Sequence, residues 1–108
     1  MTPEEEKDAF SLIVENWSAM SPNERKTAFA NLDRPEAVEL FLSLKALDQA
    51  ELLLEAQSKE KRSWVRLLAP DDVADLIQEM GPDHRDEILD MLDAQTRREV
   101  TALLAYAE

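Results

Sequence analysis

The strongest constraint in this sequence is an apolar position that recurs every twelve residues. Eight successive positions at this spacing are apolar, and so is a second set that lies eight residues further into each unit. Twelve residues hold about two helical turns and a tight corner, so two units make a helical hairpin that stacks on its neighbours. The period predicts an all-α fold, an armadillo-like α-solenoid in which short helices form a right- or left-turning superhelix. The two sets are Met20, Leu32, Leu44, Ala56, Leu68, Met80, Leu92 and Leu104, and Ala28, Leu40, Leu52, Trp64, Leu76, Ile88 and Val100.

Helix-start signals recur along the chain. Ser21-Pro22-Asn23-Glu24 combines a capping serine, a proline at the first helical position and a glutamate three residues after the cap, and Thr2-Pro3-Glu4-Glu5 has the same pattern. Asp33 and Gly81 precede two further starts. Sustained apolar/polar alternation, which marks strands, is nearly absent from the sequence. We predict helices near residues 3–19, 22–31, 34–44, 46–57, 59–67, 70–79, 82–91 and 94–106, with connections of two or three residues.

The composition leaves little material for catalysis. The chain has no cysteine, one histidine and one glycine, so thiol nucleophiles, thiolate zinc sites and glycine-rich phosphate loops are excluded. His84, which follows Pro82 and Asp83 in a first helical turn, is expected at the surface rather than in a Ser-His pair. Trp64 falls in the second apolar set and is expected in the core. We therefore predict that the protein is not an enzyme.

Acidic residues outnumber basic residues by 24 to 12, and the excess is unevenly distributed. A net charge of −12 repels nucleic acids and anionic membrane surfaces, so neither is expected as a partner. No run of about eighteen apolar residues is present that could insert into a bilayer. Between Asp71 and Asp93, nine acidic residues accompany one arginine and carry −8 of the net charge. Four basic residues and one acidic residue lie just before this stretch, between residues 59 and 66.

Three carboxylates of this stretch, Asp71, Asp75 and Glu79, stand four residues apart and share one face of the helix predicted from Pro70. We call them the acidic stripe. In one interpretation, acids in the first turn complement the helix dipole and the remainder form a solvated face near Arg62 or Arg66. In the other, the stripe is half of a divalent-cation site, because carboxylates without histidine or cysteine suit Mg²⁺ or Ca²⁺. Both interpretations stay open on spacing alone.

An ordered set of motifs occupies Leu68–Ile77, Ile88–Asp93, Arg97–Val100, Leu103–Tyr106 and, earlier in the chain, Ala37–Leu40. Together these segments resemble the cytosolic N-terminal domain of MgtE-type magnesium transporters. The family has a D-D-x-A-D element, an L-D-x-x-x-R-x-E-V run and an L-L-x-Y ending that leads into a pair of CBS domains. The similarity is strongest over residues 67–106, is weaker but collinear over about 20–66, and is limited to an amphipathic pattern over 1–19. The segment Ala37–Leu40 resembles an A-x-E element in an earlier helix of the family.

The resemblance implies a regulatory, magnesium-sensing domain of a homodimeric transporter, on the cytoplasmic face of the inner or plasma membrane. In that family, Mg²⁺ binds between acidic faces of the N-terminal domain and the neighbouring CBS domains, and its loss lets the domains separate and the pore open. Carried over to this sequence, the metal-binding residues are Glu39, Asp71 and Asp75, with Asp72 and Glu79 as weaker candidates. The partners implied are the CBS and transmembrane domains of the same protein.

The family would continue beyond Glu108 through an A-G-G segment into the CBS pair. We therefore expect one domain over residues 1–108, with an amphipathic lead helix at 1–19 and repeats at 20–106, excised from a longer protein whose CBS pair and membrane domain are absent from this chain. A free-standing relative is the alternative. Since such a domain holds only half of each shared site, we expect its own Mg²⁺ affinity to be weak.

A second functional class remains open, a non-catalytic protein–protein interaction scaffold. Similar short-helix superhelices occur in the flagellar motor switch family, where charged ridges and apolar grooves bind partner subunits. In this interpretation, the basic residues before the acidic stretch join it to form a bipolar docking surface. These basic residues are Lys59, Lys61, Arg62 and Arg66.

Overall fold

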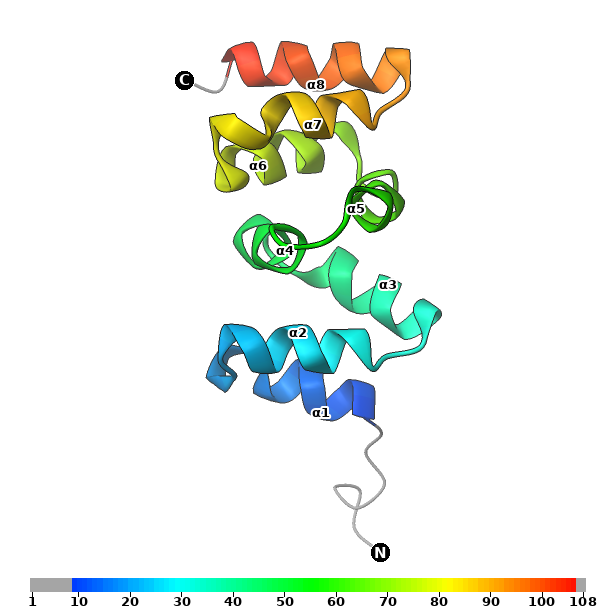
Figure 1. The fold of residues 1–108 in the computed structure, drawn as a ribbon, viewed down its shortest axis with the longest axis vertical. Coiled ribbons are helices and arrows are strands. Elements are labelled where there is room, and N and C mark those ends of the chain that lie inside the picture. The colour runs from blue at the N-terminus through cyan, green and yellow to red at the C-terminus, as the bar shows by residue number, and fades with distance from the viewer. Residues whose placement is uncertain (1–8, 107–108) are drawn as a thin grey trace, which may run out of the picture. The chain divides into compact units, whose positions relative to one another are not determined.

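The computed structural model describes residues 9–106, which form helices joined by short turns (Figure 1). No strand occurs in this range, and the all-α prediction is confirmed. None of the helices within it is both long and apolar enough to cross a membrane. The elements, with η for a 3₁₀ helix, are α1 (Ala9–Asn16), η2 (Trp17–Ala19), α2 (Pro22–Ala30), α3 (Arg34–Ser43), α4 (Ala46–Leu53), α5 (Ser58–Val65), α6 (Pro70–Met80), η3 (Pro82–His84), α7 (Arg85–Asp90) and α8 (Ala94–Tyr106).

The helix starts repeat the twelve-residue period of the sequence. From α2 onward, starts fall at residues 22, 34, 46, 58, 70, 82 and 94, each twelve residues after the one before, with η3 and α7 together filling one unit. Six of these starts were predicted to the residue, and the predicted start at 59 is one residue late. The connections are one to four residues long, slightly more varied than expected.

We call the two sets of apolar positions the first and second apolar registers. Both lie in the core. In the second register, every residue from Leu40 to Val100 is buried and Ala28 is half-buried. In the first register, Leu68, Met80 and Leu92 are buried, and the remaining members are half-buried. No residue of either register is exposed, so the period does identify the positions that pack inside.

The chain divides into two compact units, Met1–Ser43 and Leu44–Glu108. In the first, α1 contacts η2 and α3, around buried Trp17 and Phe41. The ring centroids of Phe29 and Phe41 lie 6.3 Å apart at an interplanar angle of 44°. Arg25 Nε donates to the Trp17 carbonyl oxygen (2.8 Å), and the guanidinium lies over the indole, 5.6 Å from its centroid. Arg25 therefore connects α2 to the η2 turn by contacting both the backbone and the indole ring of Trp17.

In the second unit, α6 is the central helix. It packs against α4 and α8 and also contacts η3 and α7. Its buried face consists of apolar residues at helical spacing, including Val73, Leu76 and Ile77, while its opposite face is exposed. Val65 and Ile88, both fully buried, bring α5 and α7 into the same core. Because α6 is buried along one side only, its polar side is exposed to solvent.

Local sequence explains several of the boundaries. Ser21 and Glu24 form the expected capping box, with Ser21 N–H donating to Glu24 Oε1 (2.7 Å) and Glu24 N–H donating to Ser21 Oγ (3.2 Å). Gly81 ends α6 with a φ of 95°, a conformation that favours glycine. The helix predicted over 82–91 instead begins as the 3₁₀ turn η3, and the one predicted over 46–57 ends at Leu53. The cap predicted at Thr2 lies outside the described residues.

Candidate functional site

The acidic stripe lies on the exposed side of α6. Pro70 occupies the first turn, and Asp71 and Asp72 follow it, where carboxylates interact favourably with the positive end of the helix dipole. Asp71, Asp75 and Glu79 are all exposed, on the side of α6 away from its buried face. The helix therefore presents three carboxylates in one row, as the spacing predicts.

None of these carboxylates makes a hydrogen bond or an ion pair with the part of the chain that the structure describes, and the same holds for Asp72. Arg62 is exposed and also forms no ion pair within residues 9–106, while Arg66 donates from Nε to the Met91 carbonyl oxygen (3.0 Å). The stripe is therefore not neutralised by the basic residues that precede it in the sequence.

Glu39, the third predicted metal ligand, lies in α3 and is exposed. It belongs to the unit Met1–Ser43, whereas Asp71 and Asp75 belong to the unit Leu44–Glu108. The structure thus brings Asp71 and Asp75 together on one helix face and presents Glu39 on a separate unit. Among residues 9–106, no group of three or more histidine, aspartate or glutamate side chains is arranged so that it could hold a metal ion by itself.

The basic stretch contains one residue whose role sequence reasoning missed. Lys61 was predicted on an exposed docking surface, but only 7% of its side chain is exposed. Its Nζ lies 3.2 Å from Glu87 Oε1 and 3.3 Å from Oε2, and Ser58 Oγ donates to the same carboxylate (3.3 Å). His84 Nδ1 lies 3.8 Å from Glu87 Oε1. Lys61 thus ties α5 to α7 and does not face a partner.

The twelve-residue period does not single out Lys61 as a buried residue. Stepping by twelve from Lys61 leads to buried Ala37, Gln49 and Val73, but also to exposed Arg85 and Arg97. The hydrogen bond from Lys61, with further contributions from its charge, from Ser58 and from His84, lowers the pKa of Glu87 below the usual glutamate value despite partial burial.

Asp93, the last acid of the acidic stretch, caps α8. Thr96 N–H donates to Asp93 Oδ1 (2.8 Å) and Thr96 Oγ1 donates to Oδ2 (3.0 Å). These two hydrogen bonds, the backbone one first, lower the pKa of Asp93 below the usual aspartate value. Asp93 is thus committed to a structural role, unlike the carboxylates of α6.

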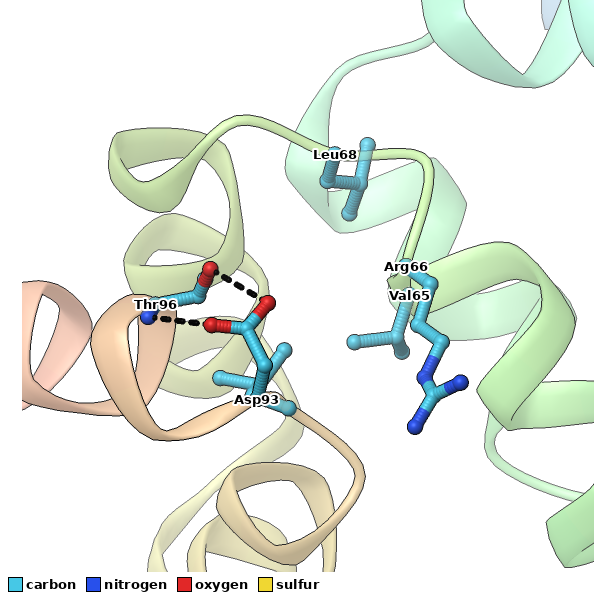
Figure 2. Close-up of a pocket in the computed structure, with 6 residues that line it drawn as sticks. Val65, Arg66, Leu68, Asp93 and Thr96 are labelled. Carbon is cyan, nitrogen blue, oxygen red and sulfur yellow. Dashed lines mark hydrogen bonds between the residues drawn. The ribbon is translucent and has the colours of Figure 1, made fainter.

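A pocket of about 310 Å³ lies beside this cap. Figure 2 shows Val65 and Arg66, from the end of α5, facing Asp93 and Thr96 across it, with Leu68 on the connection to α6. Arg66 Nε is held by the Met91 carbonyl oxygen, so the arginine is fixed at the rim. We call this the α5–α8 pocket. Its lining consists of Val65, Arg66, Leu68, Leu92, Asp93 and Thr96.

Comparison with known protein families gives one informative match. The sequence matches the MgtE intracellular N domain over residues 9–108, which includes the helices that carry Glu39 and the acidic stripe. Comparisons with curated proteins and with solved structures returned no match. Because the family match covers nearly the whole sequence, the chain belongs to the MgtE intracellular N domain family.

Proposed function

We propose that this chain is a non-catalytic regulatory domain of an MgtE-type magnesium transporter, and that its acidic face binds Mg²⁺ together with neighbouring CBS domains. Family membership supports the transporter context. The observation that carries the metal proposal is that Asp71 and Asp75 are exposed on one face of α6 without a counter-charge in residues 9–106. In the complete protein the domain would lie on the cytoplasmic side of the membrane and function within a homodimer.

The donor chemistry fits a hard divalent cation. Carboxylate oxygens are the ligands that Mg²⁺ prefers, and Mg²⁺ usually keeps several waters while using only one or two carboxylates from the protein. Asp71 and Asp75 would provide the contribution of α6, and Glu39 that of α3, with Asp72 and Glu79 adding nearby negative charge. Since no described group of side chains is complete enough to hold a metal alone, the remaining ligands would come from the partner domain.

The physical consequence is a charge-controlled contact. Without a cation, the exposed carboxylates of α6 repel any second acidic surface, the more so because the chain carries a net charge of −12. A bound Mg²⁺ supplies the positive charge that converts this repulsion into attraction. Because the ion would bind the closed arrangement better than the open one, the closed population would follow the magnesium concentration.

We also propose that the helices continue as a superhelical repeat. The helix starts at a constant spacing of twelve residues, and the burial of both apolar registers, support this arrangement. A repeat of this kind presents the same faces of successive helices along one surface.

A magnesium titration followed by NMR tests the metal proposal. We expect amides near Asp71, Asp75 and Glu39 to shift first, with weak affinity, because the chain supplies only part of the coordination. The double variant Asp71→Asn/Asp75→Asn should lose the shifts on α6 while keeping its circular dichroism spectrum. Asp86→Asn, which removes an exposed carboxylate on α7, is the matched control and should leave them unchanged. Equal, diffuse shifts at all acidic residues would show that magnesium only screens the surface.

A further inference from the structure

Three basic residues on α5 and at its C-terminal cap form an exposed row that the proposed magnesium site does not use. Lys59, Arg62 and Arg66 are exposed and lie within about 60° of one another around the helix, while the buried side of α5 holds Lys61, Trp64 and Val65. We call these three residues the basic ridge. Within residues 9–106 none of them forms an ion pair, although the chain as a whole has twice as many acidic as basic residues. Unpaired cations on one face of so acidic a protein are available to an acidic partner.

The α5–α8 pocket lies at the end of this ridge. Its floor is apolar, because Val65, Leu68 and Leu92 line it and are themselves buried. Its volume of about 310 Å³ is at the lower end of ligand pockets, which span roughly 300–1,000 Å³, and has room for an aliphatic side chain. The pocket is therefore a place where a partner can bury apolar surface next to the cations.

Arg66 joins the ridge to the pocket. Its Nε donates to the Met91 carbonyl oxygen, which fixes the side chain at the rim and leaves the terminal Nη groups without a partner among the described residues. Across the pocket, both carboxylate oxygens of Asp93 accept hydrogen bonds from Thr96, which orient this carboxylate but leave its negative charge in place (Figure 2). Glu60 lies about 100° around α5 from Lys59, to one side of the ridge. A carboxylate that approaches the rim therefore meets a positioned guanidinium.

We propose that the basic ridge and the α5–α8 pocket together form a docking surface for an acidic protein segment that carries a leucine-sized apolar side chain. The apolar side chain would enter the pocket above Val65, Leu68 and Leu92, and flanking carboxylates would pair with Arg66 and Arg62. This surface does not use the carboxylates of α6, so the proposal does not depend on magnesium binding. It also excludes Lys61 from docking, since that ammonium is buried against Glu87.

Fluorescence anisotropy with a defined peptide tests this docking surface. The probe is fluorescein-labelled Glu-Glu-Leu-Glu-Glu amide, titrated with the 108-residue chain in the presence of EDTA so that metal binding cannot contribute. We expect saturable binding that weakens with added salt. Replacing the leucine of the peptide by alanine should weaken binding by about tenfold, as expected when the burial of a leucine side chain is lost.

Variants of the protein locate the binding surface. Arg62→Glu should weaken binding by at least about threefold, because an attraction between exposed charges becomes a repulsion. Arg98→Glu is the matched control: it makes the same charge change at an exposed position about 200° around α8 from Thr96, and should leave the affinity unchanged. Circular dichroism confirms that both variants are folded. No binding of the probe, an equal loss in both variants, or equal affinity for the alanine peptide would each overturn the proposal.

Discussion

At the scale of single residues, the ion pair of Lys61 and Glu87 joins a nearly buried lysine to a half-buried glutamate. The ammonium is 7% exposed and the carboxylate 35% exposed, so the two partners do not contribute symmetrically. Removal of the carboxylate leaves a buried positive charge without its counter-ion. Removal of the ammonium leaves a carboxylate that water still reaches and that Ser58 still contacts.

We therefore expect Glu87→Gln to destabilise the protein more than Lys61→Met. The first should cost about 1–2 kcal/mol, less than for a fully buried pair because solvent screens Glu87. The second should cost less than about 1 kcal/mol, since methionine retains the apolar stem of the side chain. Urea denaturation measures both free energies of unfolding. A larger loss in Lys61→Met than in Glu87→Gln would contradict this asymmetry between the two partners.

The lowered pKa of Glu87 predicts the direction of a pH dependence. Because the folded carboxylate holds its proton less tightly than the unfolded one, the unfolded state binds more protons as the pH falls below about 4.5. The stabilisation is complete above that pH and is lost as the pH falls through the lowered pKa. The difference in unfolding free energy between the native protein and Glu87→Gln should shrink from about pH 7 to about pH 3. A difference that stays constant with pH would contradict this assignment.

At the scale of elements, the two faces of α6 differ in their role: one packs in the core, and the other exposes carboxylates to solvent. Its buried side is closely packed against α4 and α8, and its exposed side places Asp75 one turn from both Asp71 and Glu79. Like charges at this spacing destabilise a helix by roughly 0.2–0.5 kcal/mol per pair. The stripe is therefore a local cost to stability, which is typical of residues kept for binding.

Asp75→Asn should accordingly stabilise the protein by a few tenths of a kcal/mol at low salt, because it relieves repulsion with both neighbours while helix propensity hardly changes. Asp71→Asn should increase the free energy of unfolding by less, since Asp71 lies in the first turn and also interacts favourably with the helix dipole. Thermal or urea denaturation at low salt and at about 1 M NaCl, where such interactions are screened, measures the difference. A gain that persists in high salt would exclude repulsion as its cause.

At the scale of the whole molecule, the twelve-residue period predicted most of the helices because every unit repeats the same pattern of a helix start and buried apolar positions. The apolar registers recur in every unit, and some starts add a cap and a proline, as Ser21 and Pro22 illustrate, whereas α4 and α5 begin without either. The sequence could not reveal which charges become buried. Lys61 belongs to a run of basic residues, and its pairing with Glu87 depends on how α5 packs against a helix that is 26 positions away along the chain. The shared helix face of Asp71 and Asp75 was correctly predicted from their spacing. The distance between Glu39 and α6 instead depends on packing between the two units, which spacing does not reveal.

The registers also predict at which positions truncation of a side chain destabilises the core most. Ile88 is fully buried in the second register, and Ile88→Ala should destabilise the protein by about 2–5 kcal/mol. Leu104, in the first register, is only half-buried, so Leu104→Ala should cost less than half as much. Urea denaturation compares the two. Similar losses would show that the last helix contributes more to the core than its exposure indicates.

The connectivity of the second unit has a consequence for how the protein reaches its native state. The elements in most extensive contact are neighbours or next neighbours in sequence, as for α4 with α6 and α6 with α8. Each contact therefore closes a loop of about two repeat units, which keeps relative contact order low and loop-closure entropy small. Folding of this unit can proceed on the microsecond-to-millisecond scale of helical proteins. During synthesis, a helix such as α4 can therefore pack against its contacting helix as soon as the next two helices have left the ribosome.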